Sequence, residues 1–392
     1  QPNHKVKMNN KMRKILPVLI ITALLSQVIN TGLVLAQQPT GQLSTLGGTA
    51  EVVQNPVNGT LVHLEAAGKA TDTANESRIE IRFTETTTLN DLDNLSWTVN
   101  TTQGYPPHAD ILLSEDGENV SDQLVCEYAY QPHTGQVYEY QEPGDPYGHY
   151  DPGLQSSYYN PPYNQWVETF QNQTTETGTS MINNSTICWL GSGLPGPYNI
   201  TGPAAFFGKL GEFKDGTVSA IGRPENSGIS GDTQVLGIDI EVDNWIGHSE
   251  AYIGQITLNG ESSPPSITIQ SPSSTYSGDV PLEIEAKDLF TGLNITYDVM
   301  NSTGYLFYED ETYNGSTYLT GLEPGEYTLM VYAESMIGLV SEASEEFTVT
   351  VEDVMVDVTP ETLNLKSRGR WVTVEIQFPE GTSTNGFDLE DI

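Results

Sequence analysis

Short runs in which apolar and polar residues alternate recur along most of the chain. Alternation with a period of two places the apolar side chains on one face of a β-strand. After the N-terminus, no stretch has an apolar face at the 3.6-residue spacing of a helix. We therefore expect an all-β protein. Up to residue 262, the pattern predicts strands at Leu61–Leu64, Arg78–Phe83, Leu95–Val99, Ala109–Leu113, Thr233–Val242 and Ala251–Leu258.

We expect residues 49–262 to form one jelly-roll-like β-sandwich, because each alternating strand needs a facing sheet to bury its apolar side. Val242–Trp245 and Ala251–Gly260 resemble the closing strands of jelly-roll domains in extracellular proteins. Ser96–Trp97 and Gly104–Ile111 resemble segments of archaeal surface proteins. An irregular two-sheet sandwich is the alternative.

The segment Glu261–Pro265 predicts a linker and a domain boundary, because it ends in two prolines. In Leu322–Tyr327, a Pro-Gly turn precedes a tyrosine that opens an alternating strand. This segment resembles the tyrosine corner of fibronectin type III and related Ig-like modules, in which the hydroxyl bonds back to the preceding turn. The resemblance implies an Ig-like/fibronectin III-like sandwich over residues 264–352. Its predicted strands are Ser266–Gln270, Val280–Ala286, Leu293–Val299, Leu306–Tyr308, Thr317–Leu319, Tyr327–Ala333 and Glu346–Val351.

Residues 353–392 contain three further strand patterns, Met355–Val358, Leu363–Leu365 and Trp371–Phe378. They resemble a β-module found near the C-termini of secreted prokaryotic proteins. A segment of about 40 residues is too short for an independent sandwich, so we expect the start of a truncated C-terminal β-module.

The N-terminal residues 1–36 have the pattern of a signal peptide. Lys11, Arg13 and Lys14 precede the apolar run Ile15–Leu25, and Val34–Ala36 ends in a small residue suited to cleavage. An uncleaved membrane anchor is the alternative, although polar residues interrupt the apolar run. We expect residues 37–48 to be a flexible leader.

Removal of residues 1–36 makes a strongly acidic chain more acidic. The whole sequence has 15 Lys and Arg against 52 Asp and Glu, and five of the basic residues lie in that segment. Such a surface repels nucleic acids and anionic lipids. It also attracts divalent cations, so calcium is the one ion that we consider, with no other cofactor expected. Solubility alone is the alternative explanation of the charge.

The sequence has two cysteines, Cys126 and Cys188, each inside a strand-like run. In an exported protein they can form a disulfide that links two strands across the sandwich. Two buried free thiols are the alternative.

N-x-S/T sequons are the most frequent motif. They indicate N-glycosylation at the surface of an exported protein, provided that the host performs this modification. The twelve acceptors are Asn58, Asn75, Asn94, Asn100, Asn119, Asn172, Asn183, Asn184, Asn199, Asn294, Asn301 and Asn314.

The segment 128–163 is rich in tyrosine, proline and glycine and shows no regular pattern. Its rings could form a platform for a sugar or a protein, or they could pack down to order the segment. The candidate ligand-binding residues are Tyr138, Tyr140, Tyr147, Tyr150, Tyr158, Tyr159, Tyr163 and Trp166.

Candidate metal ligands are weakly defined in the sequence. His133 and His149 with Asp145 offer ligand atoms without a tight spacing. The segment Ser114–Asp122 places oxygen ligands around a glycine but lacks the full calcium-loop pattern, and an Asp-Gly β-turn explains it as well. The metal set is therefore left unknown.

These features favour an exported structural or adhesive cell-surface protein, such as an S-layer or matrix component, whose partners are further copies or other surface proteins and glycans. The resemblances point to a prokaryotic, archaeal source. A carbohydrate-binding surface protein that uses segment 128–163 is the alternative, and a secreted hydrolase is a third hypothesis. We expect no enzyme, because no spacing brings a nucleophile, a base and an orienting group together.

Overall fold

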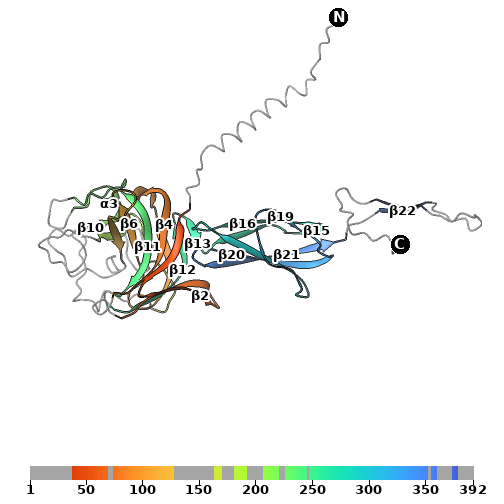
Figure 1. Ribbon diagram of the computed structural model, residues 1–392, viewed down its shortest axis with the longest axis horizontal. Coiled ribbons are helices and arrows are strands. Elements are labelled where there is room, and N and C mark those ends of the chain that lie inside the picture. Colours follow the sequence, from red (N-terminus) through yellow and green to blue (C-terminus); the bar gives the residue numbers. More distant parts are fainter. Residues whose placement is uncertain are drawn as a thin grey trace, which may run out of the picture. The chain divides into compact units, whose positions relative to one another are not determined.

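The computed structural model describes residues 38–68, 74–127, 163–169, 181–191, 206–219, 226–244, 247–351, 355–359 and 373–377. Within these ranges the protein is nearly all β, as the alternation predicts (Figure 1). The helical elements described are the short helix α3 (Leu210–Lys214) and the 3-10 turn η1 (Leu89–Asp91). None of the described helices has the length and apolarity needed to cross a membrane.

Two antiparallel sheets form the first sandwich. The larger sheet contains, in spatial order, β1 (Thr40–Leu46), β4 (Glu76–Thr88), β11 (Gln234–Asp243), β6 (His108–Ser114), β7 (Asp122–Cys126), β9 (Ile187–Leu190) and β10 (Phe207–Lys209). The smaller sheet contains β2 (Thr49–Asn55), β3 (Gly59–Ala66), β12 (Ser249–Leu258), β5 (Leu95–Gln103) and β8 (Val167–Glu168), and β13 (Glu261–Ser263) pairs with β12.

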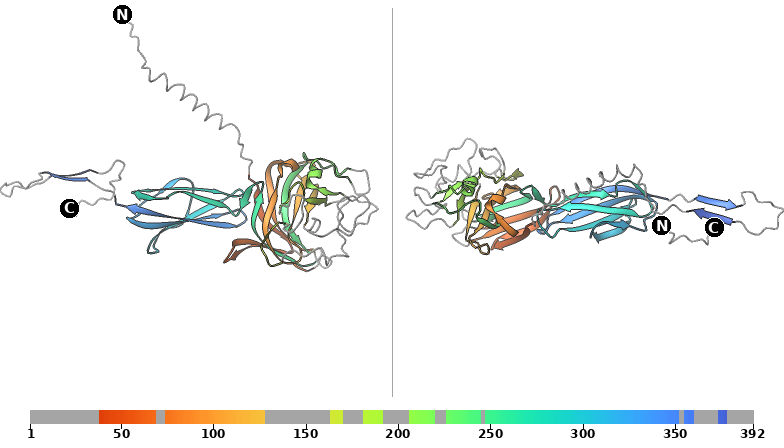
Figure 2. Two further views of the ribbon diagram at one scale, coloured as in Figure 1. Left: turned by 180° about the vertical axis from the view of Figure 1, so that it is seen from behind. Right: turned by 90° about the horizontal axis from the view of Figure 1, so that it is seen from above.

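The chain passes repeatedly from one sheet to the other, as the jelly-roll-like interpretation expects. It runs from β3 in the smaller sheet to β4 in the larger, back to β5 and again to β6, and later from β11 to β12. Figure 2 shows the two layers from behind and from above.

Alternation builds the core between these layers. Ile79 and Ile81 of β4 face it, as do Ile238 and Ile240 of β11, and all four are fully buried. Trp97 of β5 lies in the same cluster. The intervening polar residues of β4, β6 and β11 therefore lie on the opposite, outer face of the larger sheet.

The flexible leader predicted over residues 37–48 is wrong, because β1 occupies most of it. β1 pairs with β4 from Thr40↔Arg82 to Leu46↔Glu76. The sequence of this edge strand is mostly polar and lacks apolar alternation, so the sequence pattern did not predict a strand here. Gly41 lets β1 pack against the second sandwich, because a Cβ at this position would lie 2.7 Å from side-chain atoms of both Phe290 and Ile337. Only glycine allows β1 to approach the Phe290 ring and the Ile337 side chain so closely.

The second sandwich has a three-stranded and a five-stranded sheet. The first contains β14 (Ser266–Ser271), β16 (Val280–Lys287) and β19 (Thr317–Leu319). The second contains β15 (Thr275–Ser277), β21 (Val340–Thr350), β20 (Gly325–Glu334), β17 (Asn294–Asn301) and β18 (Leu306–Thr312), with β15 and β21 parallel.

A separate core fills this sandwich, with Leu282, Val299, Leu329 and Val331 fully buried. The hydroxyl of Tyr327 donates a hydrogen bond of 2.7 Å to the backbone oxygen of Glu323. The bond that the tyrosine-corner resemblance implies is therefore present.

The outer edge of the five-stranded sheet is irregular. β18 pairs with β17 through shifted registers between Tyr297 and Met300. Its exposed tip carries Glu309, Asp310 and Glu311, and Asp310 has a φ of 51°. Farther along the chain, β22 (Met355–Thr359) and β23 (Thr373–Gln377) form an antiparallel pair, while the strand predicted at Leu363–Leu365 lies outside the described residues.

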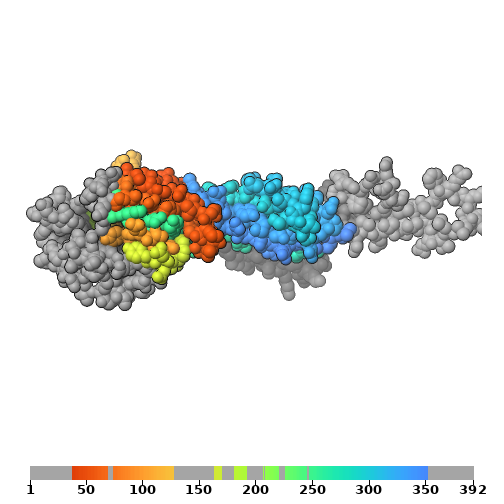
Figure 3. All heavy atoms as spheres, turned by 90° about the horizontal axis from the view of Figure 1, so that it is seen from below, coloured from red at the N-terminus to blue at the C-terminus, as the bar shows by residue number. Residues whose placement is uncertain are grey.

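The two sandwiches share a hydrophobic cluster. Leu289, Phe290, Ile337 and Leu339 of the second sandwich belong to the core cluster of the first. Figure 3 shows N-terminal strands, in red, in contact with the second sandwich, in blue. In the segment Glu261–Pro265, residues Glu261–Ser263 form strand β13, which pairs with β12 of the first sandwich. The second sandwich begins with β14 at Ser266, directly after the two prolines.

Polar contacts accompany this apolar joint. The Thr60 hydroxyl donates to the backbone oxygen of Val340 (3.3 Å) and accepts from its backbone N–H (2.6 Å). The N–H of Thr291 donates to the oxygen of Pro39, and that of Leu289 to the oxygen of Ser262. We call this set of contacts the joint.

Candidate functional site

Charged residues form a patch on the outer face of the larger sheet. We call it the acidic ladder. It contains seven carboxylates, two guanidinium groups and one imidazole, from Glu76, Arg78, Glu80, Arg82, His108, Asp110, Glu127, Asp239, Glu241 and Asp243.

Strand register aligns the acidic ladder into rows. Glu241 on β11 lies between Arg78 on β4 and His108 on β6. In the next row, Asp239 is directly opposite Glu80 on one side and Asp110 on the other. Directly opposed residues on antiparallel strands have Cβ atoms about 4.5–5.5 Å apart, so each row holds its charges in contact.

The two arginines neutralise the β4 side of the acidic ladder. Arg78 contacts Glu76, Asp239 (3.3 Å) and Glu241 (3.4 Å). Arg82 pairs with Glu80 at 3.0 Å and also contacts Asp239. Burial alone would lower the pKa of Arg78, but the charges of Glu241, Asp239 and Glu76 raise it.

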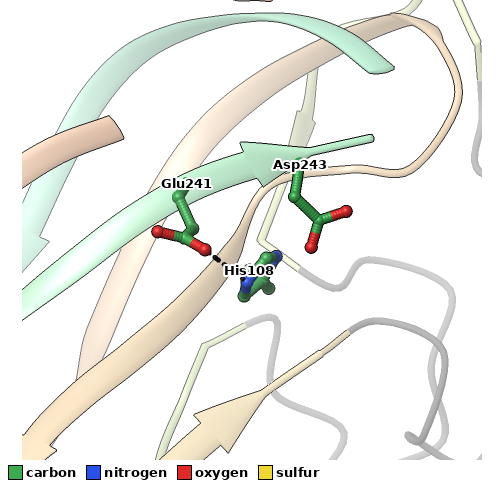
Figure 4. Close-up of side chains that lie close together, drawn as sticks. All are labelled: His108, Glu241 and Asp243. Atoms are coloured by element: carbon green, nitrogen blue, oxygen red, sulfur yellow. Dashed lines mark ion pairs between the residues drawn. The ribbon is translucent and has the colours of Figure 1, made fainter. Parts of the chain in front are cut away.

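The β6 side has no guanidinium group among the described residues. His108 Nε2 lies 3.3 Å from Glu241 Oε1 and 3.7 Å from Asp110 Oδ1. All three side chains are buried: His108 is 7% exposed, Glu241 is 6% exposed and Asp110 is 5% exposed. One ligand atom each of His108, Glu241 and Asp243 lies within 4.8 Å of the other two, and Figure 4 shows the imidazole beside both carboxylates.

Burial and mutual charge shift the pKa values here. Burial alone would lower the pKa of His108, but Glu241 and Asp110 raise it well above its ordinary value. Burial raises the pKa of Asp110, and it raises that of Glu127 to about 7. The pKa of Glu241 is lowered despite burial, because His108 and Arg78 favour its charged form. The arrangement can therefore hold either protons or a cation.

The disulfide predicted between Cys126 and Cys188 is present, but its position differs from the expected one. β7 and β9 are neighbours in the larger sheet, and their register pairs Leu124 with Leu190 and Val125 with Trp189. The cysteines are thus directly opposite, with Cα atoms 4.5 Å apart, as in a non-hydrogen-bonded pair. The bond joins adjacent strands rather than the two sheets.

The described acceptor asparagines are all at least partly exposed. Asn58, Asn119, Asn184 and Asn314 are exposed in turns or loops, and Asn294 is exposed at the start of β17. Asn75, Asn94, Asn100, Asn183 and Asn301 are partly buried, and Asn172 and Asn199 lie outside the described residues.

The described residues include only a small part of the predicted aromatic platform and none of the first metal candidate. Tyr138, Tyr140, Tyr147, Tyr150, Tyr158 and Tyr159 lie outside the described residues, as do His133, His149 and Asp145. Tyr163 and Trp166 are described, and they are 36% and 37% exposed. The Tyr163 hydroxyl donates to the backbone oxygen of Gly104.

The candidate calcium loop is explained by its own hydrogen bonds. The carboxylate of Asp116 accepts from the backbone N–H groups of Glu118 and Asn119, from the Asn119 amide and from the Ser114 hydroxyl. The hydrogen bonds of Asn119 are the main cause of the lowered pKa of Asp116. A turn capped by Asp116 accounts for this sequence, as the β-turn interpretation expects.

Sequence reasoning missed the acidic ladder, although a signal was present. His108 and Asp110 are two residues apart in a strand, and so are Asp239, Glu241 and Asp243. Each set is interleaved with core residues, which places its charged members together on the outer face. Pairing of β6 with β11 could not be read from the sequence.

A hollow of about 450 Å³ lies over the second sandwich, away from the acidic ladder. Its lining includes Glu326 and Glu346 on neighbouring strands, together with Tyr327 and Phe347. None of the described residues that line it has an imidazole or guanidinium group. The hollow therefore has fewer kinds of side chain that could bind an ion or transfer a proton than the acidic ladder has.

No family model matches the chain, and no curated protein matches its sequence. Among solved structures, the chain is similar to the crystal structure of a β-1,2-glucanase from Parabacteroides distasonis, at 9% identity and a TM-score of 0.23. The match covers 81% of this chain and 38% of that chain. A similarity this low carries no argument about function.

Proposed function

We propose that this chain is an exported, glycosylated structural or adhesive protein of a prokaryotic, archaeal cell surface, of the S-layer or matrix kind. The observation that carries the proposal is the joint. Phe290 and Ile337 of the second sandwich extend the core of the first, and Thr60 and Val340 bond across it. Tandem modules that share a core suit a protein that must hold its parts in a fixed relation.

Two further features support this proposal. The second sandwich has the Tyr327 corner bond of Ig-like/fibronectin III-like modules, which often serve as spacers. Exposed acceptors such as Asn58, Asn119 and Asn314 offer sites where a glycan can attach without disturbing a core. Under this proposal the protein acts without catalysis, and calcium bridges acidic faces of neighbouring copies.

The test uses the full chain in its host. Intact cells are treated with a membrane-impermeant label and with protease, and the protein from the envelope fraction is analysed by glycopeptide mass spectrometry. We expect labelling, protease sensitivity and glycans on exposed acceptors. A protein found unlabelled inside the cell and without glycans would overturn the proposal.

Self-assembly is tested separately on the purified glycoprotein. Addition of calcium should raise light scattering, and a chelator should reverse it. Magnesium at the same ionic strength is the control, because it retains its water more strongly than calcium. Equal scattering with both ions would contradict specific calcium bridging.

Carbohydrate binding is the second candidate function. The observation in its favour is the pair of half-exposed rings, Tyr163 and Trp166, beside β8. A glycan array should then show binding that Trp166→Ala abolishes, while the control Tyr305→Ala, which removes a ring 64% exposed on the second sandwich, has no effect. Equal binding by both variants would remove this candidate.

A further inference from the structure

We propose that His108, Glu241 and Asp243 bind one divalent transition-metal ion of the zinc type. Asp110 completes the ligand set. This site is independent of the proposed surface function, because it lies on the outer face of one sheet rather than at the joint.

The first argument is the way in which carboxylates meet the imidazole. Glu241 and Asp110 both approach Nε2 of His108, at 3.3 and 3.7 Å. A ring nitrogen carries at most one proton, which it can direct well at only one acceptor. Two carboxylates that converge on one nitrogen are the arrangement expected around a shared metal ion.

A second histidine in the same sandwich shows the contrast. His63 on β3 contacts Glu51 through Nδ1 at 3.5 Å and Glu250 through Nε2 at 3.0 Å. Its ring also stacks on Tyr252, with centroids 4.7 Å apart. Each ring nitrogen has its own carboxylate, so these groups form ordinary ion pairs and do not converge on one point.

The second argument is the buried oxygen of Asp110. Oδ1 is buried and has no hydrogen-bond partner among the described residues, and Asp110 is 5% exposed. A buried carboxylate oxygen without a hydrogen-bond partner is costly unless a cation neutralises it. The imidazole of His108 lies 3.7 Å from Oδ1, which is too far for a hydrogen bond. The arginines do not contact Asp110, since Arg78 and Arg82 contact carboxylates of β4 and β11.

The third argument is distance. Ligands about 2.0–2.1 Å from a tetrahedral zinc ion lie roughly 3.3–3.4 Å from one another. The Nε2–Oε1 separation of 3.3 Å between His108 and Glu241 fits this value, and the Nε2–Oδ1 separation of 3.7 Å to Asp110 needs a small adjustment. Asp243 has an atom within 4.8 Å of the ligand atoms of His108 and Glu241, so it has to move closer to them to bind the same ion.

The choice of ion follows from the ligand types. Calcium and magnesium prefer sites made of oxygen atoms alone. An imidazole nitrogen with carboxylates suits zinc and its neighbours, including cobalt. The site therefore differs from the calcium-bridging surface that the overall charge suggests.

The test is zinc binding by the full chain after metal removal with a chelator. Calorimetry should give one tight site per chain, calcium should not compete, and cobalt should give the visible absorption of tetrahedral coordination. Asp243→Asn and His108→Gln should each weaken zinc binding at least about tenfold, the scale of losses at metal sites. His63→Gln is the matched control and should bind as the unmodified protein does.

Circular dichroism checks that each variant is folded. If His108→Gln does not fold, Asp243→Asn decides, because Asp243 is partly exposed and asparagine has nearly the same shape. The proposal is overturned if zinc shows no saturable site, if folded Asp243→Asn binds with unchanged affinity, or if His63→Gln weakens binding as much as the ladder variants do.

Discussion

Single residues set the pH response at the joint. Asp288 is 2% exposed, and burial raises the pKa of its carboxyl from 3.8 to about 6. The folded protein thus holds this proton more tightly than the unfolded chain does. Ionisation of Asp288 therefore lowers the stability as the pH rises from about 4 to about 6, by roughly 3 kcal/mol at neutral pH.

Asp288→Asn should remove this cost. We expect the variant to be more stable than the unmodified protein at pH 7, by up to about 3 kcal/mol, and equally stable below pH about 4, where the aspartate is protonated in both states. Urea unfolding at both pH values measures the difference. The exposed Asp279→Asn is the control, and a gain at pH 7 that persists at low pH would contradict the explanation.

Tyr327→Phe should lower the stability of the second sandwich by about 1 kcal/mol, the net contribution of one hydrogen bond, because it removes the bond to Glu323. Thermal unfolding measures the loss. Tyr305→Phe is the matched control, since that ring is 64% exposed. If both variants unfold at the same temperature, the corner bond does not stabilise the fold.

The site illustrates what the sequence could predict at this scale. The predicted strands Ala109–Leu113 and Thr233–Val242 contain Asp110 and Glu241, and their alternation places both on outer faces. His108 precedes the predicted strand and was therefore not placed. Nothing in the sequence indicated that these two strands are neighbours, because about 120 residues separate them and strand pairing over such distances depends on the whole topology.

Among the elements, the strands with alternating apolar residues were predicted well, and their ends were off by a few residues. β4 extends to Thr88, beyond its predicted end at Phe83, because backbone pairing continues after the alternation of apolar and polar residues has stopped. β1 was missed because a strand that is stabilised by pairing and by a glycine contact needs no apolar alternation. The cysteines were assigned to strands correctly, while the relation of those strands was not.

The disulfide between β7 and β9 closes a chain segment of 62 residues. Cys126→Ala with Cys188→Ala should lower the free energy of unfolding by roughly 4 kcal/mol, because the open chain gains entropy when it unfolds. Calorimetry measures the loss, and the single variant Cys188→Ala should lose about as much because it also breaks the bond. A loss below about 1 kcal/mol in both would show that strand pairing alone holds this edge.

At the scale of the whole molecule, the joint should make the two sandwiches unfold together. The unmodified protein should give one calorimetric transition across residues 39–351. Gly41→Val places a side chain where Phe290 and Ile337 lie, so it should separate the unfolding into two transitions. Thr45→Val, at an exposed position of the same strand, is the control. Two transitions in the unmodified protein would contradict a cooperative joint.

The irregular edge at β18 also limits how copies of this protein can meet. A straight exposed edge would allow a strand of another molecule to add by backbone pairing, and such growth continues into fibrils. The shifted register with β17 and the acids from Glu309 to Glu311 prevent that addition. Under the proposed surface function, contacts between copies at this edge would have to use side chains, and they could open again without unfolding either partner.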